Sequence, residues 1–121
     1  MPELKKYQMF IDGQWVDSDT KKTFETLNPE NNKPWAVVPE ASANDVDRAV
    51  KAAQKAFEGE WPKMLARDRA KYLRAIGNKL RENSELLGKI ETIDTGKLYR
   101  ETYQQAKYIA EYYDYYAGLA D

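Results

Sequence analysis

The sequence predicts an α+β fold in which a short β-hairpin and further short strands precede about four helices. Two observations lead to this prediction. Over residues 8–40, apolar residues alternate or form short runs bounded by Gly, Pro and Asn, whereas over residues 42–121 they recur at helical spacing. A change of period from two to about 3.6 residues separates strands from helices. The length of 121 residues fits one domain or part of one.

Three extended runs are expected in the first part. Asp12-Gly13 lies at the centre of the run 7–16, and this dipeptide suits a tight hairpin turn that needs positive φ. A second run, 23–27, ends at Asn28-Pro29, and a third, 35–38, lies between two prolines. Turn residues that bound short β-branched and aromatic runs indicate strands.

Four helices are expected after residue 41. Ser42 can cap the first, with Asp45 as its capping-box partner, and Gly59 ends it. The second covers 66–82, where Gly77 indicates a close helix contact because Gly otherwise weakens a helix. The third runs from residue 84 to Gly96, and the last covers about 101–119. We expect Trp61, which precedes Pro62, to anchor the core.

The composition excludes several classes of function. The chain has no Cys and no His, which removes disulfides, thiolate or imidazole catalysis and Cys/His metal sites. Its six Gly occur singly, so no Gly-rich phosphate loop can be written. The net charge of −1 gives no basic field for nucleic acid. No long apolar run or signal-peptide core is present, so we expect a cytoplasmic protein without a membrane or nucleic-acid partner.

Five strings extend the prediction through a family resemblance: FIDGQWV, TFETLNP, ANDVDRAVKAAQKAF, IETIDTGK and EYYDYYAGLAD. Their order and spacing resemble the N-terminal segment of aldehyde dehydrogenases, particularly the branch of betaine aldehyde and general aldehyde dehydrogenases. The resemblance implies the outer part of an NAD-binding α/β domain over residues 1–121. It also implies that this part is incomplete without the remainder of the polypeptide and that the protein is a homo-oligomer.

The resemblance implies an enzyme that oxidises an aldehyde to a carboxylic acid with NAD or NADP. In that family a Cys thiolate attacks the aldehyde and a hydride passes to the cofactor. The family's catalytic and nucleotide-binding residues match no position of this chain, so we expect residues 1–121 alone to be structural and inactive. The alternative, from another class, is a freestanding non-catalytic module that binds a partner through its Tyr-rich last helix.

The resemblance also implies a site for K+ or Na+. Some family members hold such an ion with a backbone carbonyl and an Asp, which match Thr26, Leu27 and Asp94 here. Oxygen ligands suit hard cations. The alternative is that Asp94 caps the following turn or pairs with Lys97.

In the family the last helix lines part of the substrate tunnel, and Tyr108 matches a lining position. Aromatic faces there could receive an apolar aldehyde or a quaternary ammonium group. The alternative, expected for at least four of six rings, is packing against the chain's own domain with the hydroxyls reaching water. These six are Tyr103, Tyr108, Tyr112, Tyr113, Tyr115 and Tyr116. The basic residues of the second helix alternate with acidic ones, which indicates a solvated face.

Overall fold

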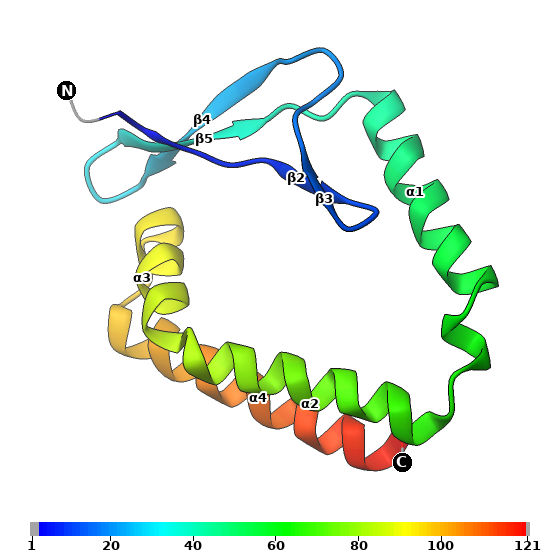
Figure 1. Ribbon diagram of the computed structural model, residues 1–121. Helices are drawn as coiled ribbons and strands as arrows, with labels where there is room; N and C mark the ends of the chain where they lie inside the picture. Colours follow the sequence, from blue (N-terminus) through cyan, green and yellow to red (C-terminus); the bar gives the residue numbers. More distant parts are fainter. Residues whose placement is uncertain (1–2, 121) are drawn as a thin grey trace. The chain divides into compact units, whose positions relative to one another are not determined.

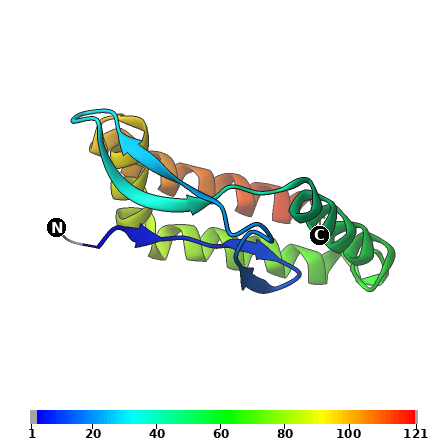
Figure 2. The same cartoon turned by 90° about the horizontal axis from the view of Figure 1, so that it is seen from above.

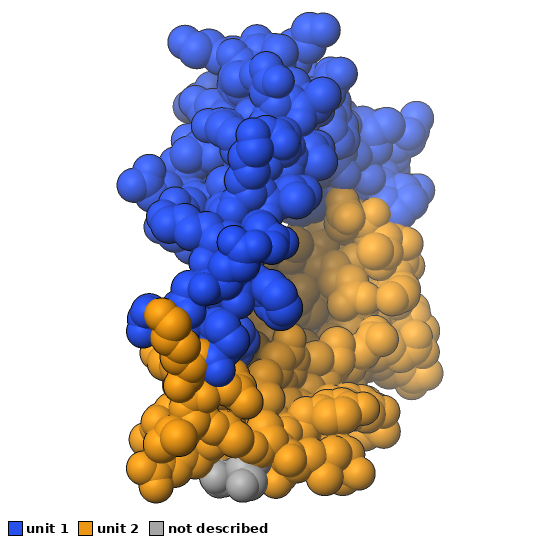
Figure 3. Space-filling model, turned by 90° about the vertical axis from the view of Figure 1, so that its right-hand side faces the viewer, with its two compact units in different colours: residues 1–62 blue, residues 63–121 orange. Residues whose placement is uncertain are grey.

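The computed structural model describes residues 3–120, which form two compact units divided after Pro62 (Figure 3). The first unit holds all the strands and helix α1, and the second holds α2, α3 and α4 (Figure 1). Residues 1, 2 and 121, at the ends of the predicted range, lie outside the described residues. The predicted order of strands followed by four helices is confirmed.

The first unit contains two small sheets. In the three-stranded sheet, β5 (Lys33–Pro39) lies between β1 (Lys5–Lys6), which is parallel to it, and β4 (Thr23–Asn28), which is antiparallel. The second sheet is the predicted hairpin of β2 (Met9–Ile11) and β3 (Gln14–Val16). Its turn has positive φ at Asp12 (50°) and Gly13 (78°), as the Asp-Gly pair predicts. The sequence did not predict β1, because two lysines form no apolar alternation.

The β4–β5 hairpin is a curved ribbon (Figure 2). Its register shifts between Thr26 and Leu27, so the ladder is irregular there. The connecting turn is stabilised by Asn28, whose side-chain Oδ1 accepts the Glu30 N–H at 2.9 Å, and Asn32 takes a φ of 55°. Asn tolerates this left-handed conformation better than most residues.

Helix α1 (Ala43–Glu58) begins at the predicted capping box and ends at Gly59. Its apolar stripe is exposed, with exposed fractions of 61% for Val50 and 69% for Phe57. Trp61, in the short 3-10 turn η1 (Trp61–Lys63), is also exposed at 44%. The expectation that Trp61 anchors a core is therefore wrong for the described chain, because a large part of its side chain faces solvent.

The second unit is a bundle of α2 (Ala66–Glu82), α3 (Ser84–Thr95) and α4 (Tyr99–Ala120) (Figure 1). Helix α4 packs along α2 and against α3. Small residues make this contact close: the buried apolar residues of the bundle are Ala70, Ala106, Ala110 and Ala117. A Cβ at Gly77 would lie 3.1 Å from the Ala110 carbonyl oxygen, which confirms the predicted close helix contact.

Helices α3 and α4 meet at Gly88. The buried Thr102 hydroxyl donates to the Gly88 carbonyl oxygen at 2.9 Å and also lies 2.9 Å from the Thr92 hydroxyl. Gly96, with a φ of 74°, ends α3 as the sequence predicted. Within residues 3–120 the structure contains no helix of the length and apolarity needed to cross a membrane.

Candidate functional site

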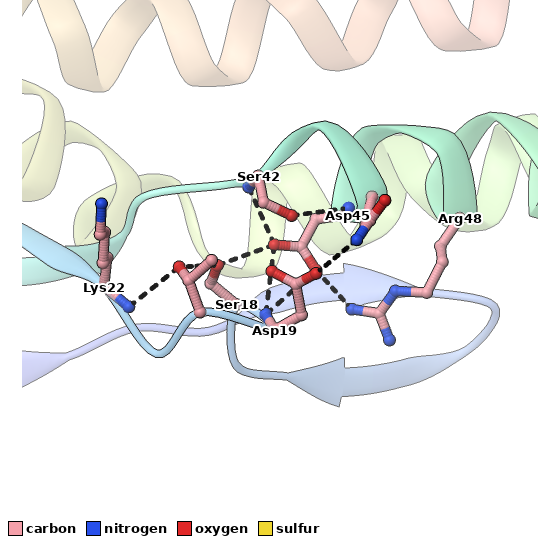
Figure 4. Close-up of polar contacts among 8 residues, drawn as sticks. Ser18, Asp19, Lys22, Ser42, Asp45 and Arg48 are labelled. Atoms are coloured by element: carbon pink, nitrogen blue, oxygen red, sulfur yellow. Dashed lines mark hydrogen bonds and ion pairs between the residues drawn. The ribbon is translucent and has the colours of Figure 1, made fainter.

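The most enclosed charged group of the first unit is the Asp45 carboxylate, in the first turn of α1 (Figure 4). Its side chain is fully buried. The Ser18 hydroxyl donates to it at 2.7 Å and the Ser42 backbone N–H at 2.9 Å. The Asp19 N–H adds contacts at 3.3 Å, and the Arg48 guanidinium completes the set at 2.6 Å. Donors from two segments thus surround one carboxylate.

These donors favour the ionised carboxylate. The backbone N–H of Ser42 contributes most, and the Ser18 hydroxyl and Arg48 add to it, so the pKa of Asp45 lies well below its ordinary value although burial opposes the shift. A carboxyl that is charged and fully hydrogen-bonded is a poor proton donor or acceptor at neutral pH. Asp45 therefore joins the 18–19 segment to α1 as a structural link.

The sequence predicted only half of this link. The Ser42–Asp45 capping box was visible because the two residues lie three positions apart. The contacts from Ser18 and Asp19 span 27 and 26 positions. No local signal marks such a pair, and a long polar stretch at residues 17–22 looks like an ordinary loop.

The residues expected to bind a monovalent cation lie in different units. Thr26 and Leu27 are on β4, at its register shift, and Asp94 is exposed near the end of α3. Lys97, one of the expected partners of Asp94, forms an ion pair with Glu91 at 2.7 Å. No group of three or more acidic, His or Cys side chains suited to a metal occurs within residues 3–120. The cation site stays a prediction.

Most of the six Tyr rings of α4 do not pack against their own unit. Tyr108, Tyr112, Tyr115 and Tyr116 are between 48% and 63% exposed, and with Glu111 they line a shallow hollow on the helix surface. Tyr103 and Tyr113 are half-buried. The expectation that at least four rings pack inward is therefore wrong, because α2 and α3 cover one side of α4 only.

Tyr108 and Tyr112 form an edge-to-face pair with ring centroids 5.0 Å apart. The Tyr112 hydroxyl donates to the Tyr108 hydroxyl at 3.1 Å, and this bond raises the pKa of Tyr112. The Tyr112 hydroxyl is thus protonated at neutral pH, and the pair offers aromatic faces and hydrogen bonds. The substrate-lining role of Tyr108 stays a prediction.

The charged face of α2 is a solvated surface, as its alternating charges predicted. Lys71 pairs with Asp68 and Lys79 with Glu82, both at 2.7 Å, and Arg81 pairs with Asp114 of α4. Exposed pairs of this kind contribute little energy individually. They neutralise three of the six basic residues of α2, which weakens the case for an anion or RNA site there.

Comparison with known proteins places this architecture in a family. The model of the aldehyde dehydrogenase family matches residues 15–121. The chain is 40% identical, over 98% of its length, to (Z)-2-((N-methylformamido)methylene)-5-hydroxybutyrolactone dehydrogenase of Acinetobacter baylyi, and covers 24% of that protein. It is also 40% identical, over its whole length, to aldehyde dehydrogenase family 2 member C4 of Arabidopsis thaliana, and covers 25% of it.

A solved structure shows the same fold. Betaine aldehyde dehydrogenase of Staphylococcus aureus, determined in complex with NAD+, matches 94% of this chain with a TM-score of 0.91 at 43% identity. The match covers 23% of that protein. The chain thus spans about a quarter of the length of the curated and solved relatives it matches, and its fold is that of their N-terminal part.

Proposed function

Since the chain belongs to the aldehyde dehydrogenase family, we propose that it is the N-terminal segment of an enzyme that oxidises an aldehyde to a carboxylic acid with NAD or NADP. In this proposal residues 1–121 supply scaffold and no catalytic group. The observation that supports it is the match along nearly the whole chain, at a TM-score of 0.91, to a quarter of a protein that was solved with NAD+.

The residues of this chain do not fit a dinucleotide. A phosphate-binding turn needs clustered glycines before a helix N-terminus, whereas Gly13, Gly59, Gly77 and Gly88 stand far apart. The N-terminus of α1 is already occupied, because Ser42 and Asp45 satisfy each other's backbone donors there. The cofactor would therefore be held by residues outside this chain, and hydride transfer to it would depend on those residues.

Neither a Cys thiol nor a free Ser hydroxyl is present within residues 3–120. The chain contains no Cys, and its serines are Ser18, Ser42 and Ser84. Ser18 donates to Asp45, Ser42 caps α1, and Ser84 donates to the Arg81 carbonyl oxygen at 2.9 Å. A nucleophilic hydroxyl requires an adjacent general base that takes its proton, and each of these hydroxyls has a structural role instead.

A chimera tests the proposal directly. The matching N-terminal quarter of the Staphylococcus aureus betaine aldehyde dehydrogenase is replaced by residues 1–121, and NADH absorbance is followed with betaine aldehyde. We expect the chimera to form NADH and the isolated chain to form none. NADH formation by the isolated chain, with contaminating enzyme excluded, would overturn the non-catalytic assignment. A folded chimera that neither binds NAD nor oxidises aldehyde would contradict the enzyme proposal and favour the interaction module, which the exposed tyrosines of α4 suggest.

The cation site and the assembly form the remainder of the proposal. We propose that the parent enzyme is a cytoplasmic homo-oligomer, and that Asp94 and the Thr26–Leu27 carbonyls contribute to K+ or Na+ binding within it. The chimera carrying Asp94→Ala should then lose part of the rise in melting temperature that the ion gives the unsubstituted chimera. Equal ion-dependent rises in both proteins would assign Asp94 a purely local role.

A further inference from the structure

We propose that a pocket in the first unit binds a small organic anion with an apolar body, such as an aliphatic or aromatic carboxylate. The pocket lies where the end of β1, the 17–23 segment and β5 come together. Its volume of about 490 Å³ is within the ~300–1,000 Å³ typical of small-molecule sites. All of its lining residues belong to the first unit.

The rim of this pocket is basic in an acidic unit. Lys21 and Lys22 line it together with Lys6, which pairs with Glu3 at 3.5 Å, and Asp17 is the one acidic lining residue within residues 3–120. Asp17 is engaged by the Gln8 side-chain amide, which donates to its Oδ1 at 2.8 Å. Over residues 3–62 acidic residues outnumber basic ones by eleven to eight. The positive charge of Lys21 and Lys22 is therefore a local reversal of the unit's charge, and it favours an anion.

The inner wall of the pocket is apolar. Val37, Pro39 and the ring of Tyr7 form it, all half-buried. Tyr7 is fixed in place, because its N–H donates to the Val37 carbonyl oxygen at 2.9 Å and its ring packs edge-on against Trp35. The Tyr7 hydroxyl is buried and has no hydrogen-bond partner among residues 3–120. This hydroxyl is shielded from solvent, so Tyr7 contributes apolar surface to the pocket wall.

The segment that carries two of the lysines is held rigidly. Ser18 lines the pocket and is anchored by its 2.7 Å bond to buried Asp45 (Figure 4). The Lys21 N–H donates back to the Ser18 carbonyl oxygen at 2.9 Å, and Lys21 takes a φ of 56°. Because the turn is fixed before a ligand arrives, less conformational entropy is lost when one binds.

Inorganic phosphate is the competing ligand, since lysines attract any anion. Phosphate could pair with the lysines at the rim, but it has no apolar group to cover the wall of Val37, Pro39 and Tyr7. Burial of apolar surface is favourable in proportion to its area. An organic carboxylate uses both features, so it should bind more tightly than phosphate despite its smaller charge.

The test is a titration of the ¹⁵N-labelled chain with benzoate and, separately, with phosphate, followed by amide shifts at residues 6–8 and 21–23. We expect saturable shifts with benzoate, and a dissociation constant raised about threefold to tenfold in the Lys21→Gln/Lys22→Gln double variant, because exposed charge pairs contribute modestly. Lys51→Gln is the matched control, since Lys51 is an exposed lysine of the same unit that pairs with Asp47 on α1.

Three results would overturn the proposal. The first is an absence of saturable benzoate shifts at these amides. The second is an equal loss of binding in the Lys51→Gln control and the double variant, which would mean nonspecific charge attraction. The third is phosphate binding as tight as benzoate binding, which would remove the role of the apolar wall. An unchanged amide spectrum of each variant without ligand shows that the fold is intact.

Discussion

Replacing Gly88 with Ala tests the close contact between α3 and α4 at that residue. A Cβ at position 88 would lie 2.9 Å from both the backbone N and the Cα of Tyr103, and 3.2 Å from its Cβ. Backbone atoms cannot rotate aside as a flexible side chain can, so α4 must shift away from α3. The same shift strains the 2.9 Å bond from the Thr102 hydroxyl to the Gly88 carbonyl oxygen.

The magnitude follows from two opposing effects. Overpacking a well-packed contact costs about 1–3 kcal/mol, whereas Gly→Ala within a helix contributes about 0.5–1 kcal/mol of stability. Because the clash is with backbone, the cost should dominate, and we expect Gly88→Ala to lower the free energy of unfolding by about 1–2 kcal/mol. For a unit of this size that corresponds to a melting temperature lower by roughly 4–16 °C.

Thermal unfolding followed by circular dichroism, at one protein concentration, measures the effect. Gly118→Ala is the matched control: position 118 is also helical, and its Cβ would meet no atom within 4 Å. The Gly118→Ala substitution should raise the free energy of unfolding by about 0.5–1 kcal/mol. Gly77→Ala, with the Ala110 carbonyl oxygen at 3.1 Å, should fall between the two. A Gly88→Ala chain that melts at or above Gly118→Ala would refute this account of the α3–α4 contact.

Three further results are expected. Asp45→Asn should melt below the unsubstituted chain at neutral pH. The pKa of Asp45 in the folded chain is depressed, so the stabilisation that its carboxylate gives is present above the ordinary Asp pKa of about 3.9 and is lost as pH falls below that value. A difference in melting temperature between the unsubstituted chain and Asp45→Asn that stays constant from pH 7 to pH 2 would contradict this. Tyr108→Phe should lower the pKa of Tyr112, because it removes the hydroxyl to which the Tyr112 hydroxyl donates. The pKa is measured from phenolate absorbance against pH, and an unchanged value in the variant would contradict this prediction. The chain alone should self-associate or exchange an element between copies, because Val50 and Phe57 leave an apolar stripe in water; sedimentation equilibrium showing a monomer at all concentrations would disprove it.

Local signals in the sequence determined the elements and their ends. The bounds of α2 were predicted without error, the Ser42–Asp45 box fixed the start of α1, and Gly59 and Gly96 marked two helix ends. These features depend on residues within four positions of each other, so the backbone conformation they favour can be recognised before any packing is known. The family resemblance, now confirmed, likewise depended on short strings in a fixed order.

The tertiary structure alone decided what those elements contact. A helical period shows that Val50 and Phe57 share a face of α1 but not whether anything covers that face. The Ser18–Asp45 bond joins positions 27 residues apart, and the lysine pocket gathers three chain segments. Such contacts depend on how separated segments approach in space. Side-chain periodicity describes one element at a time, so exposure, long-range hydrogen bonds and pockets are determined only when the chain folds.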